Sequence, residues 1–182
     1  MENKLKGIIA EKTTRKDSDI AEIVKWCSIH IKGFNIYNHI ARVCATISTV
    51  SESTKWEIIK NCISHPDFKT ELIKESDTGL TLMMAVSSLI FNEGMNSPSI
   101  MAVVKQLLEK CDNINYVDDD GYACLDYLID NKWSDGHQLK IFEKDDIIKL
   151  YIKNGAKCEK YANLIYIKNV ARIMELEKLL SL

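Results

Sequence analysis

The sequence predicts an all-α protein built as a short array of helix-turn-helix repeats, and three observations support this prediction. The 182 residues include only 7 Gly and 2 Pro, which is scarce for an all-β chain that needs many turns. A lysine-containing apolar string recurs five times, and a glycine-centred turn pattern occurs twice between these strings. Repeats with a period of about 20 to 50 residues are typical of solenoid proteins.

The recurring string has two aliphatic residues, a lysine and a mostly apolar run. It reads EIVKWC at 22–27, EIIKNC at 57–62, AVVKQLL at 102–108 and DIIKLYI at 146–152, and a shortened form, LEKLLSL, lies at 176–182. The lysines lie 29 to 45 residues apart. In a helix, the apolar positions form one stripe and the lysine lies at its solvated edge. Each string therefore predicts a helix with one buried face.

The turn pattern reads SDTGLTLMMAV at 76–86 and DDDGYACLDYL at 118–128. Aligning Gly79 with Gly121 pairs Thr81 with Ala123. Glycine adopts backbone conformations closed to other residues, and aspartate side chains can accept hydrogen bonds from free backbone N–H groups. We expect the same tight turn in both segments, each one opening a buried helix.

The complete set of expected helices follows from these patterns. They span residues 18–31, 36–49, 53–64, 80–92, 98–110, 122–132, 143–154, 160–169 and 171–181. Each paired repeat exposes an apolar face that only its neighbour can cover, so we expect one cooperative block.

These residues resemble those of an ankyrin repeat protein. The family's unit runs D-x-x-G-x-T-P-L-H-x-A-A and then E-I-V-K-L-L-L-x-x-G-A-D-V-N, with a period near 33. Asp118, Gly121 and Leu125 match the first half, and 148–156 and 104–115 match the second. The resemblance implies a single domain over 1–182, an α-solenoid of about four to five helix-turn-helix repeats. The repeats would span approximately 1–35, 36–77, 78–117, 118–158 and a capping 159–182.

The chain also departs from the family pattern. No repeat contains the Thr-Pro-Leu-His string, whose Thr and His help to join neighbouring repeats in the family, so looser stacking is implied. Two intervals between the repeated lysines, of 45 and 44 residues, exceed the family period. The excess falls at 88–99 and 131–144, as helix extensions or as inserted loops.

The resemblance implies protein binding through the turn tips and the concave face formed by the inner helices. Trp133, in the second insertion, is an additional candidate contact. The candidate partner-binding residues are Asp77, Thr78, Leu80, Met84, Asp119, Asp120, Tyr122, Asp126 and Trp133. Because aspartates cluster at the second tip, a partner with a basic surface is expected.

Composition suggests an origin for the chain. It contains 21 lysines against 3 arginines, and 24 isoleucines, a bias that resembles proteins encoded by AT-rich genomes. Degenerate repeats and a short chain further resemble the ankyrin proteins of large DNA viruses and other pathogens. That resemblance implies a host-interaction or immune-modulating role. A viral helical bundle like the apoptosis regulators is the alternative, but it would not explain the repeat register.

Charge, hydropathy and cysteine usage exclude several classes of protein. The formal net charge of −2 offers no global field for nucleic acid or an anionic membrane. The longest uncharged stretch, 78–92, is shorter than the ~18 to 20 apolar residues of a membrane span. The sequence begins with no secretory signal, and its six cysteines lie in helical patterns. Reduced thiols and a cytoplasmic location are therefore expected.

A metal-binding or redox protein is the second alternative, because C-x-x-H occurs at Cys27–His30 and again at Cys62–His65. Two Cys and two His could satisfy tetrahedral zinc. However, both pairs share one register of the repeated helix and would lie roughly 10 Å apart. Zinc needs its ligands at about 2.0 to 2.3 Å. Without a nucleophile or phosphate-loop motif either, we expect no metal, no other cofactor and no enzymatic activity.

Overall fold

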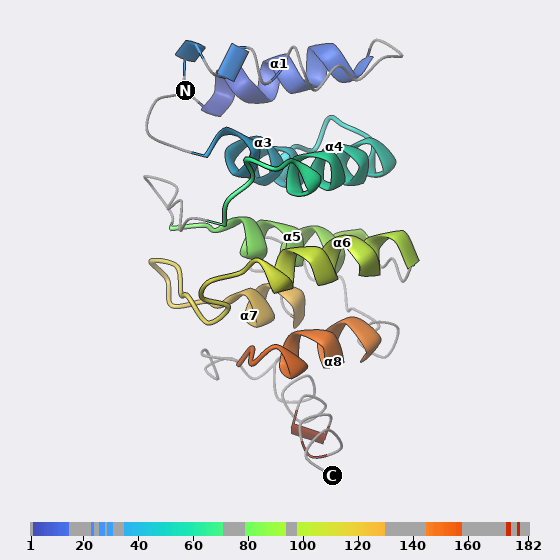
Figure 1. Ribbon diagram of the computed structural model, residues 1–182, viewed down its shortest axis with the longest axis vertical. Coiled ribbons are helices and arrows are strands. Elements are labelled where there is room, and N and C mark those ends of the chain that lie inside the picture. Colours follow the sequence, from blue (N-terminus) through green and yellow to red (C-terminus); the bar gives the residue numbers. More distant parts are fainter. Residues whose placement is uncertain are drawn as a thin grey trace. The chain divides into compact units, whose positions relative to one another are not determined.

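The computed structural model describes residues 2–14, 23, 26–27, 29–30, 35–70, 79–93, 98–129, 145–157, 174–175 and 178 (Figure 1). The chain divides into two compact units, unit 1 (Met1–Ile73) and unit 2 (Lys74–Leu182). The helices are α1 (Glu2–Thr14), α3 (Ile36–Thr46) and α4 (Glu52–Ser64) in unit 1, and α5 (Leu82–Glu93), α6 (Pro98–Glu109), α7 (Cys124–Ile129) and α8 (Asp145–Lys153) in unit 2. No strand occurs among the described residues, so the all-α prediction is confirmed for them.

Most of the expected helices agree with these bounds. Those at 36–49, 53–64, 80–92, 98–110 and 143–154 are confirmed to within a few residues at each end, and α7 lies inside the expected 122–132. The described residues within 18–31 and 171–181 are helical, whereas 160–169 lies outside the described residues. Helical periodicity was therefore a sound guide over the described chain.

Helix α1 corrects the sequence prediction, which placed no helix before residue 18. Its Leu5 and Ile9 are fully buried, and α1 packs against α3. Residues four apart share one helical face, so two side chains anchor a helix that is otherwise largely polar. A stripe this narrow falls short of the three to four apolar residues per two turns that identify an amphipathic helix.

Unit 1 is centred on the pairing of α3 with α4, which lie side by side (Figure 1). The buried α4 residues follow the helical stripe predicted from the repeated string, with Lys60 exposed outside it. Asn35 caps α3 by accepting the Asn38 N–H at 3.1 Å, and Ser51 caps α4. Side-chain caps of this kind supply partners for backbone N–H groups that have none within the helix.

Unit 2 packs its helices in alternation along the sequence. Helix α5 packs against α7, α6 packs against α8, and α7 also contacts α8. The first turns of α5 are buried on every side, from Leu82 through Ser87, as expected for a helix with neighbours around it. On α6, Val103, Val104, Leu107 and Leu108 are buried while Lys105 is exposed. The lysine again lies outside the buried stripe.

A buried hydroxyl pair joins α5 to α8. Ser87 Oγ donates to the Met83 carbonyl oxygen at 2.8 Å and lies 2.9 Å from the Tyr151 hydroxyl oxygen. Because a serine hydroxyl has one proton, Tyr151 is the donor in the second bond. Burial raises the pKa of Tyr151 well above its ordinary value, so the phenol keeps the proton that it donates.

Within the described part of the chain, no helix combines the length and the apolar character that crossing a membrane requires.

We predict that Ser87→Ala destabilises unit 2 more than Tyr151→Phe does. Ser87→Ala leaves the buried Tyr151 hydroxyl without its acceptor, which costs about 1 to 3 kcal/mol. Tyr151→Phe leaves Ser87 bonded to Met83 and should cost about 1 kcal/mol, the net contribution of one hydrogen bond. Urea unfolding of both variants and of the double variant measures this difference. If the double variant costs the sum of the two single changes, the hydroxyls are not coupled.

Candidate functional site

The candidate site is the acidic turn, Asp118–Tyr122, which precedes α7. The Asp118 side chain is buried, and its Oδ1 accepts the backbone N–H of Asp120 at 3.0 Å and of Tyr122 at 2.8 Å. Its Oδ2 accepts the Tyr127 hydroxyl at 2.6 Å. Two backbone bonds close the turn, from Gly121 N to Asp118 O and from Asp118 N to Tyr122 O, both at 3.0 Å. The Asp118 carboxylate and these two backbone bonds therefore hold the turn together.

Tyr127 is the donor that holds this carboxylate from the α7 side. Burial is the main cause that raises the pKa of Tyr127 far above its ordinary value of 10.0, and the hydrogen bond and negative charge of Asp118 add to it. The phenol therefore stays protonated and donates to Asp118. The Tyr122 ring lies 6.0 Å from the Tyr127 ring at an angle of 57°, which holds the last residue of the acidic turn against α7.

The turn before α5 has the same register as the acidic turn, as the alignment of Gly79 with Gly121 predicted. Both glycines have positive φ, 68° and 82°. The first helical bonds are equivalent too, from Ala85 N to Thr81 O and from Tyr127 N to Ala123 O.

The starts of α5 and α7 are capped by side chains at different positions of the turn. Thr81 Oγ1 accepts the Met84 N–H at 3.2 Å, whereas Asp126 Oδ2 accepts the Ala123 N–H at 2.8 Å. A capping box has two bonds, from the N3 N–H to the N-cap side chain and from the N-cap N–H to the N3 side chain. Helix α5 uses the first of these bonds and α7 uses the second.

The two turns lie against each other. A Cβ atom added to Gly79 would lie 3.1 Å from Asp119 Oδ1, 3.2 Å from Asp119 N and 3.3 Å from Asp118 Cα. A Cβ added to Gly121 would meet nothing within 4 Å. Gly79 therefore allows the first turn to approach the acidic turn closely.

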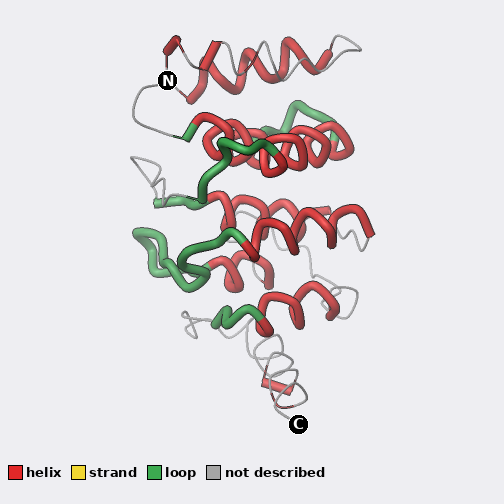
Figure 2. The backbone as a smooth tube through the Cα atoms, in the orientation of Figure 1, coloured by secondary structure: helices red, strands yellow, loops and turns green. Residues whose placement is uncertain are grey.

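A third turn is joined to the loop that carries the acidic turn. Asn115 Nδ2 donates to the Gly155 carbonyl at 2.8 Å, and Asn115 Oδ1 accepts the Lys157 N–H at 2.8 Å. Both segments are drawn as loops on the same side of unit 2 (Figure 2). A single amide side chain thus bridges the loop before α7 and the loop after α8.

Sequence reasoning missed the bridging role of Asn115, although a signal was present. Asn115 lies ten residues after Lys105, and Asn35 lies ten residues after Lys25. Asn35 makes the equivalent bond in unit 1, donating from Nδ2 to the Asp67 carbonyl at 2.7 Å. The repeated lysine string could therefore have identified both asparagines.

Of the predicted contact residues, those in the acidic turn are accessible. Asp119 and Asp120 are exposed, and Leu80 and Tyr122 are half-buried. Met84 and Asp126 were predicted as contacts, and their burial corrects this, since both side chains are 0% exposed. Met84 packs inside the buried start of α5, and Asp126 is turned inward as a cap. Asp77, Thr78 and Trp133 lie outside the described residues.

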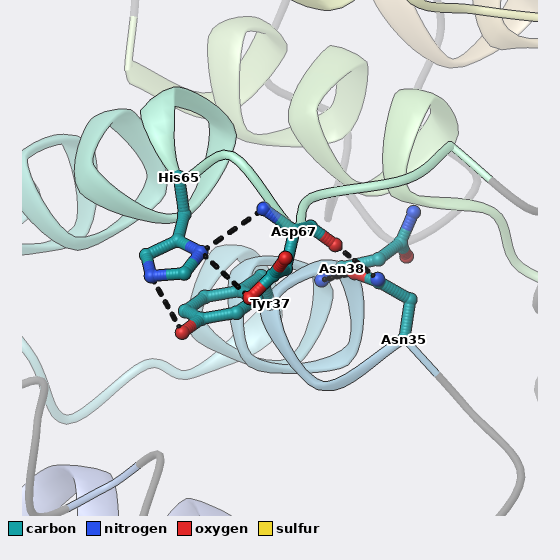
Figure 3. Close-up of polar contacts among 5 residues, drawn as sticks. All are labelled: Asn35, Tyr37, Asn38, His65 and Asp67. Atoms are coloured by element: carbon teal, nitrogen blue, oxygen red, sulfur yellow. Dashed lines mark hydrogen bonds and ion pairs between the residues drawn. The ribbon is translucent and has the colours of Figure 1, made fainter.

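A second polar cluster lies in unit 1, where the start of α3 meets the end of α4 (Figure 3). The His65 ring stacks on the Tyr37 ring with centroids 3.7 Å apart. Its Nδ1 accepts the Asp67 N–H at 3.2 Å, and its Nε2 lies 2.8 Å from the Tyr37 hydroxyl. An imidazole protonated on Nε2 satisfies both contacts. Asn38 Nδ2 also donates to the Lys69 carbonyl at 3.0 Å, so this cluster ties the segment after α4 to α3.

In unit 1, the histidines of the two C-x-x-H pairs stack on different aromatic rings. His30 is exposed and stacks on Trp26, whereas His65 stacks on Tyr37. Cys27 and Cys62 are fully buried. Among the residues that the structure describes, no group of three or more His, Cys, Asp or Glu side chains could hold a metal ion.

Burial also suppresses the nucleophilic form of these thiols. It raises the pKa of Cys27 to about 11 and that of Cys44 to about 12. The pKa of Cys62 rises further, through burial and then through the neighbouring Cys44 and Cys27. A reactive cysteine needs the opposite shift, toward the thiolate. At neutral pH these three side chains pack as small apolar groups.

Comparison of the chain with protein-family models, with curated proteins and with solved structures found no match.

We predict that Gly79→Ala destabilises unit 2 more than Gly121→Ala does. Both changes place a side chain at positive φ, which costs about 1 to 2 kcal/mol. Only Gly79→Ala adds the contact of its Cβ with Asp118 and Asp119, so it should cost more. Urea unfolding of the two variants measures the difference, and equal losses would contradict the close approach of the two turns.

We also predict that unit 1 loses stability as the pH rises above 9. An ordinary cysteine thiol has a pKa near 9.0, whereas in the fold the thiols of Cys27, Cys44 and Cys62 have higher pKa values. Their raised pKa values contribute stability that is fully present below pH 9 and is lost above it, by about 1.4 kcal/mol per pH unit for each ionising thiol. Tryptophan fluorescence in a Trp133→Phe background follows unit 1 through Trp26 and Trp56. Cys44→Ala should flatten this dependence between pH 9 and 10.5, and an unchanged slope would contradict the prediction.

Proposed function

We propose that the chain is a non-enzymatic protein-binding module, built from ankyrin-like repeats, that recognises a partner with a basic surface through its acidic turn. The observation that carries this proposal is that three consecutive aspartates differ in their exposure to solvent. Asp118 is buried and holds the turn, whereas Asp119 and Asp120 are exposed. The turn thus presents two carboxylates on a backbone that is already fixed.

The repeated features of unit 2 support the ankyrin-like part of the proposal. The turns at Gly79 and Gly121 have the same register, and they lie against each other. Helices α5 and α7 follow these turns and pack together, while α6 and α8 carry the repeated lysine strings and also pack together. Stacking of like helices on like helices is what a solenoid requires, because each repeat buries its apolar face against the next.

The exposed part of the acidic turn supports the basic-partner part. Val117, beside Asp118, is 39% exposed, and the half-buried Tyr122 closes the turn. Two carboxylates flanked by an aliphatic and an aromatic side chain suit a lysine or arginine side chain, which has an apolar stem and a cationic head. The carboxylates would mainly speed association and select the partner, and the apolar contacts would slow dissociation.

Binding of this kind acts by occlusion, since the module covers a surface of its partner without chemical change. The bias toward lysine and isoleucine, and the resemblance to ankyrin proteins of large DNA viruses and other pathogens, make a host protein the first partner to test. The role would then be host interaction or immune modulation.

We predict that Asp119→Lys/Asp120→Lys lowers capture of the partner by at least about tenfold, the loss of about 1.4 kcal/mol in binding free energy. The measurement is a quantitative pull-down from host cytosol with purified full-length chain, read by mass spectrometry. Because Asp118 and backbone groups hold the turn, the variant should keep the circular dichroism and melting curve of the original chain. Capture by the original chain should also weaken as salt is raised.

The matched control is Glu57→Lys/Glu109→Lys, which changes the net charge equally at exposed positions on α4 and α6. It should leave capture unchanged. The proposal is wrong if the acidic-turn variant retains every partner, or if both variants lose the same partners equally.

A further inference from the structure

We propose that Asn154–Gly155, at the end of α8, is a site of spontaneous deamidation that the fold holds closed, and that Asn115 helps to keep it closed. This inference does not depend on the proposed binding function. Asn154 is the only asparagine in the sequence that precedes a glycine. Glycine lacks the Cβ that would hinder attack by its own backbone nitrogen, so this peptide bond is the most susceptible in the chain.

The segment forms a complete helix C-cap. Gly155 has a φ of 83°, its N–H donates to Ile152 O at 2.9 Å, and the Ala156 N–H donates to Tyr151 O at 3.1 Å. These two bonds, with glycine in the left-handed conformation, define a Schellman motif. Ala156 and Tyr151 are both buried, which supplies the apolar contact that accompanies the motif.

The reaction needs the two groups that this cap holds. The backbone nitrogen of Gly155 forms a bond to Asn154 Cγ, and Nδ2 leaves as ammonia, which carries away the proton from the Gly155 amide. Solvent water then opens the cyclic imide at either carbonyl and gives aspartate or isoaspartate. In the structure the Gly155 N–H is donated to Ile152, and Asn154 Nδ2 donates to Leu150 O at 2.8 Å. Attack therefore requires the end of α8 to open first.

Asn115 secures the same cap from the neighbouring loop. Its Nδ2 donates to the carbonyl oxygen of Gly155, and its Oδ1 accepts the N–H of Lys157, both at 2.8 Å. These bonds lie on either side of the buried Ala156. Any opening that frees the Gly155 nitrogen must strain or break them, so the bridge lowers the population of the reactive form.

The product would not restore the original cap. A carboxylate at residue 154 puts negative charge at the C-terminal end of α8, where the helix dipole is already unfavourable to it. It also loses the donor to Leu150 O. An isoaspartate inserts one more carbon into the backbone beside Gly155, so the carbonyl that Asn115 bonds is displaced. Deamidation would thus release the bridge between the loop before α7 and the loop after α8.

The test is ageing of the full-length chain at pH 8 and 37 °C, with deamidation at residue 154 followed by peptide mapping and isoaspartate by enzymatic methylation. We expect the native chain to react at least about tenfold more slowly than the same chain in urea, because reaction requires local opening. Asn115→Ala removes both hydrogen bonds to this segment, so it should raise the native rate by more than the roughly fivefold that one lost hydrogen bond would give.

Asn35→Ala is the matched control. Asn35 occupies the equivalent position after the repeated lysine string in unit 1, and its side chain donates to the Asp67 carbonyl, not to Gly155. It should leave the rate at residue 154 unchanged. If Asn115→Ala fails to fold, Asn115→Asp keeps the acceptor for Lys157 and removes the donor to Gly155, and should still speed the reaction.

Three outcomes would overturn the inference. The native chain could deamidate as fast as the chain in urea, neither change at Asn115 could alter the rate, or Asn35→Ala could raise the rate as much as Asn115→Ala.

Discussion

The Asp118 carboxylate is the constraint on which the candidate site depends. It takes two backbone N–H groups from its own turn and one hydroxyl from α7. A hydrogen bond to a charged group contributes about 1.5 to 3 kcal/mol, and Gly121 adopts its positive φ without the steric cost that a residue with a Cβ atom would have. The turn can therefore keep glycine in a left-handed conformation and still be rigid. Because Tyr127 belongs to α7, the same carboxylate sets the angle at which the chain enters that helix.

A side-chain amide performs a similar task between turns. The chain lacks the Thr-Pro-Leu-His string, which implied weak joining of successive repeats, but Asn35 and Asn115 each bond the turn that follows the next lysine-bearing helix. An amide can donate and accept at once, and Asn115 uses both capacities. Asn35 uses its oxygen to cap α3, so Asn38 supplies the additional bond to the segment after α4. Each unit thus obtains its turn-to-turn bonds from asparagine.

Helical periodicity and turn chemistry allowed much of the fold to be predicted, because both depend on residues close in sequence. The lysine strings located α4, α6 and α8, and the glycine alignment gave the register of two turns. Helix α1 was missed because the buried side chains in its described part, Leu5 and Ile9, form a narrow stripe, and their burial depends on packing against α3. The burial of Met84 and Asp126 was missed for the same reason. Whether a residue on α5 or α7 faces a partner or another helix is decided by packing that local patterns do not specify.

The three aspartates show what such patterns leave open at the site itself. Asp118, Asp119 and Asp120 are chemically identical, and only the family resemblance separated them, by matching Asp118 to the turn pattern and leaving Asp119 and Asp120 as candidate contacts. Only the position of Tyr127, nine residues further on, makes the first one a structural residue. That acid is buried, whereas the other two are exposed. A surface of this kind is ordered before any partner arrives, so binding to it avoids the entropy cost of fixing a loop. In the proposed binding role, the buried acid would therefore contribute to recognition without touching a partner, by holding the backbone that carries the exposed pair.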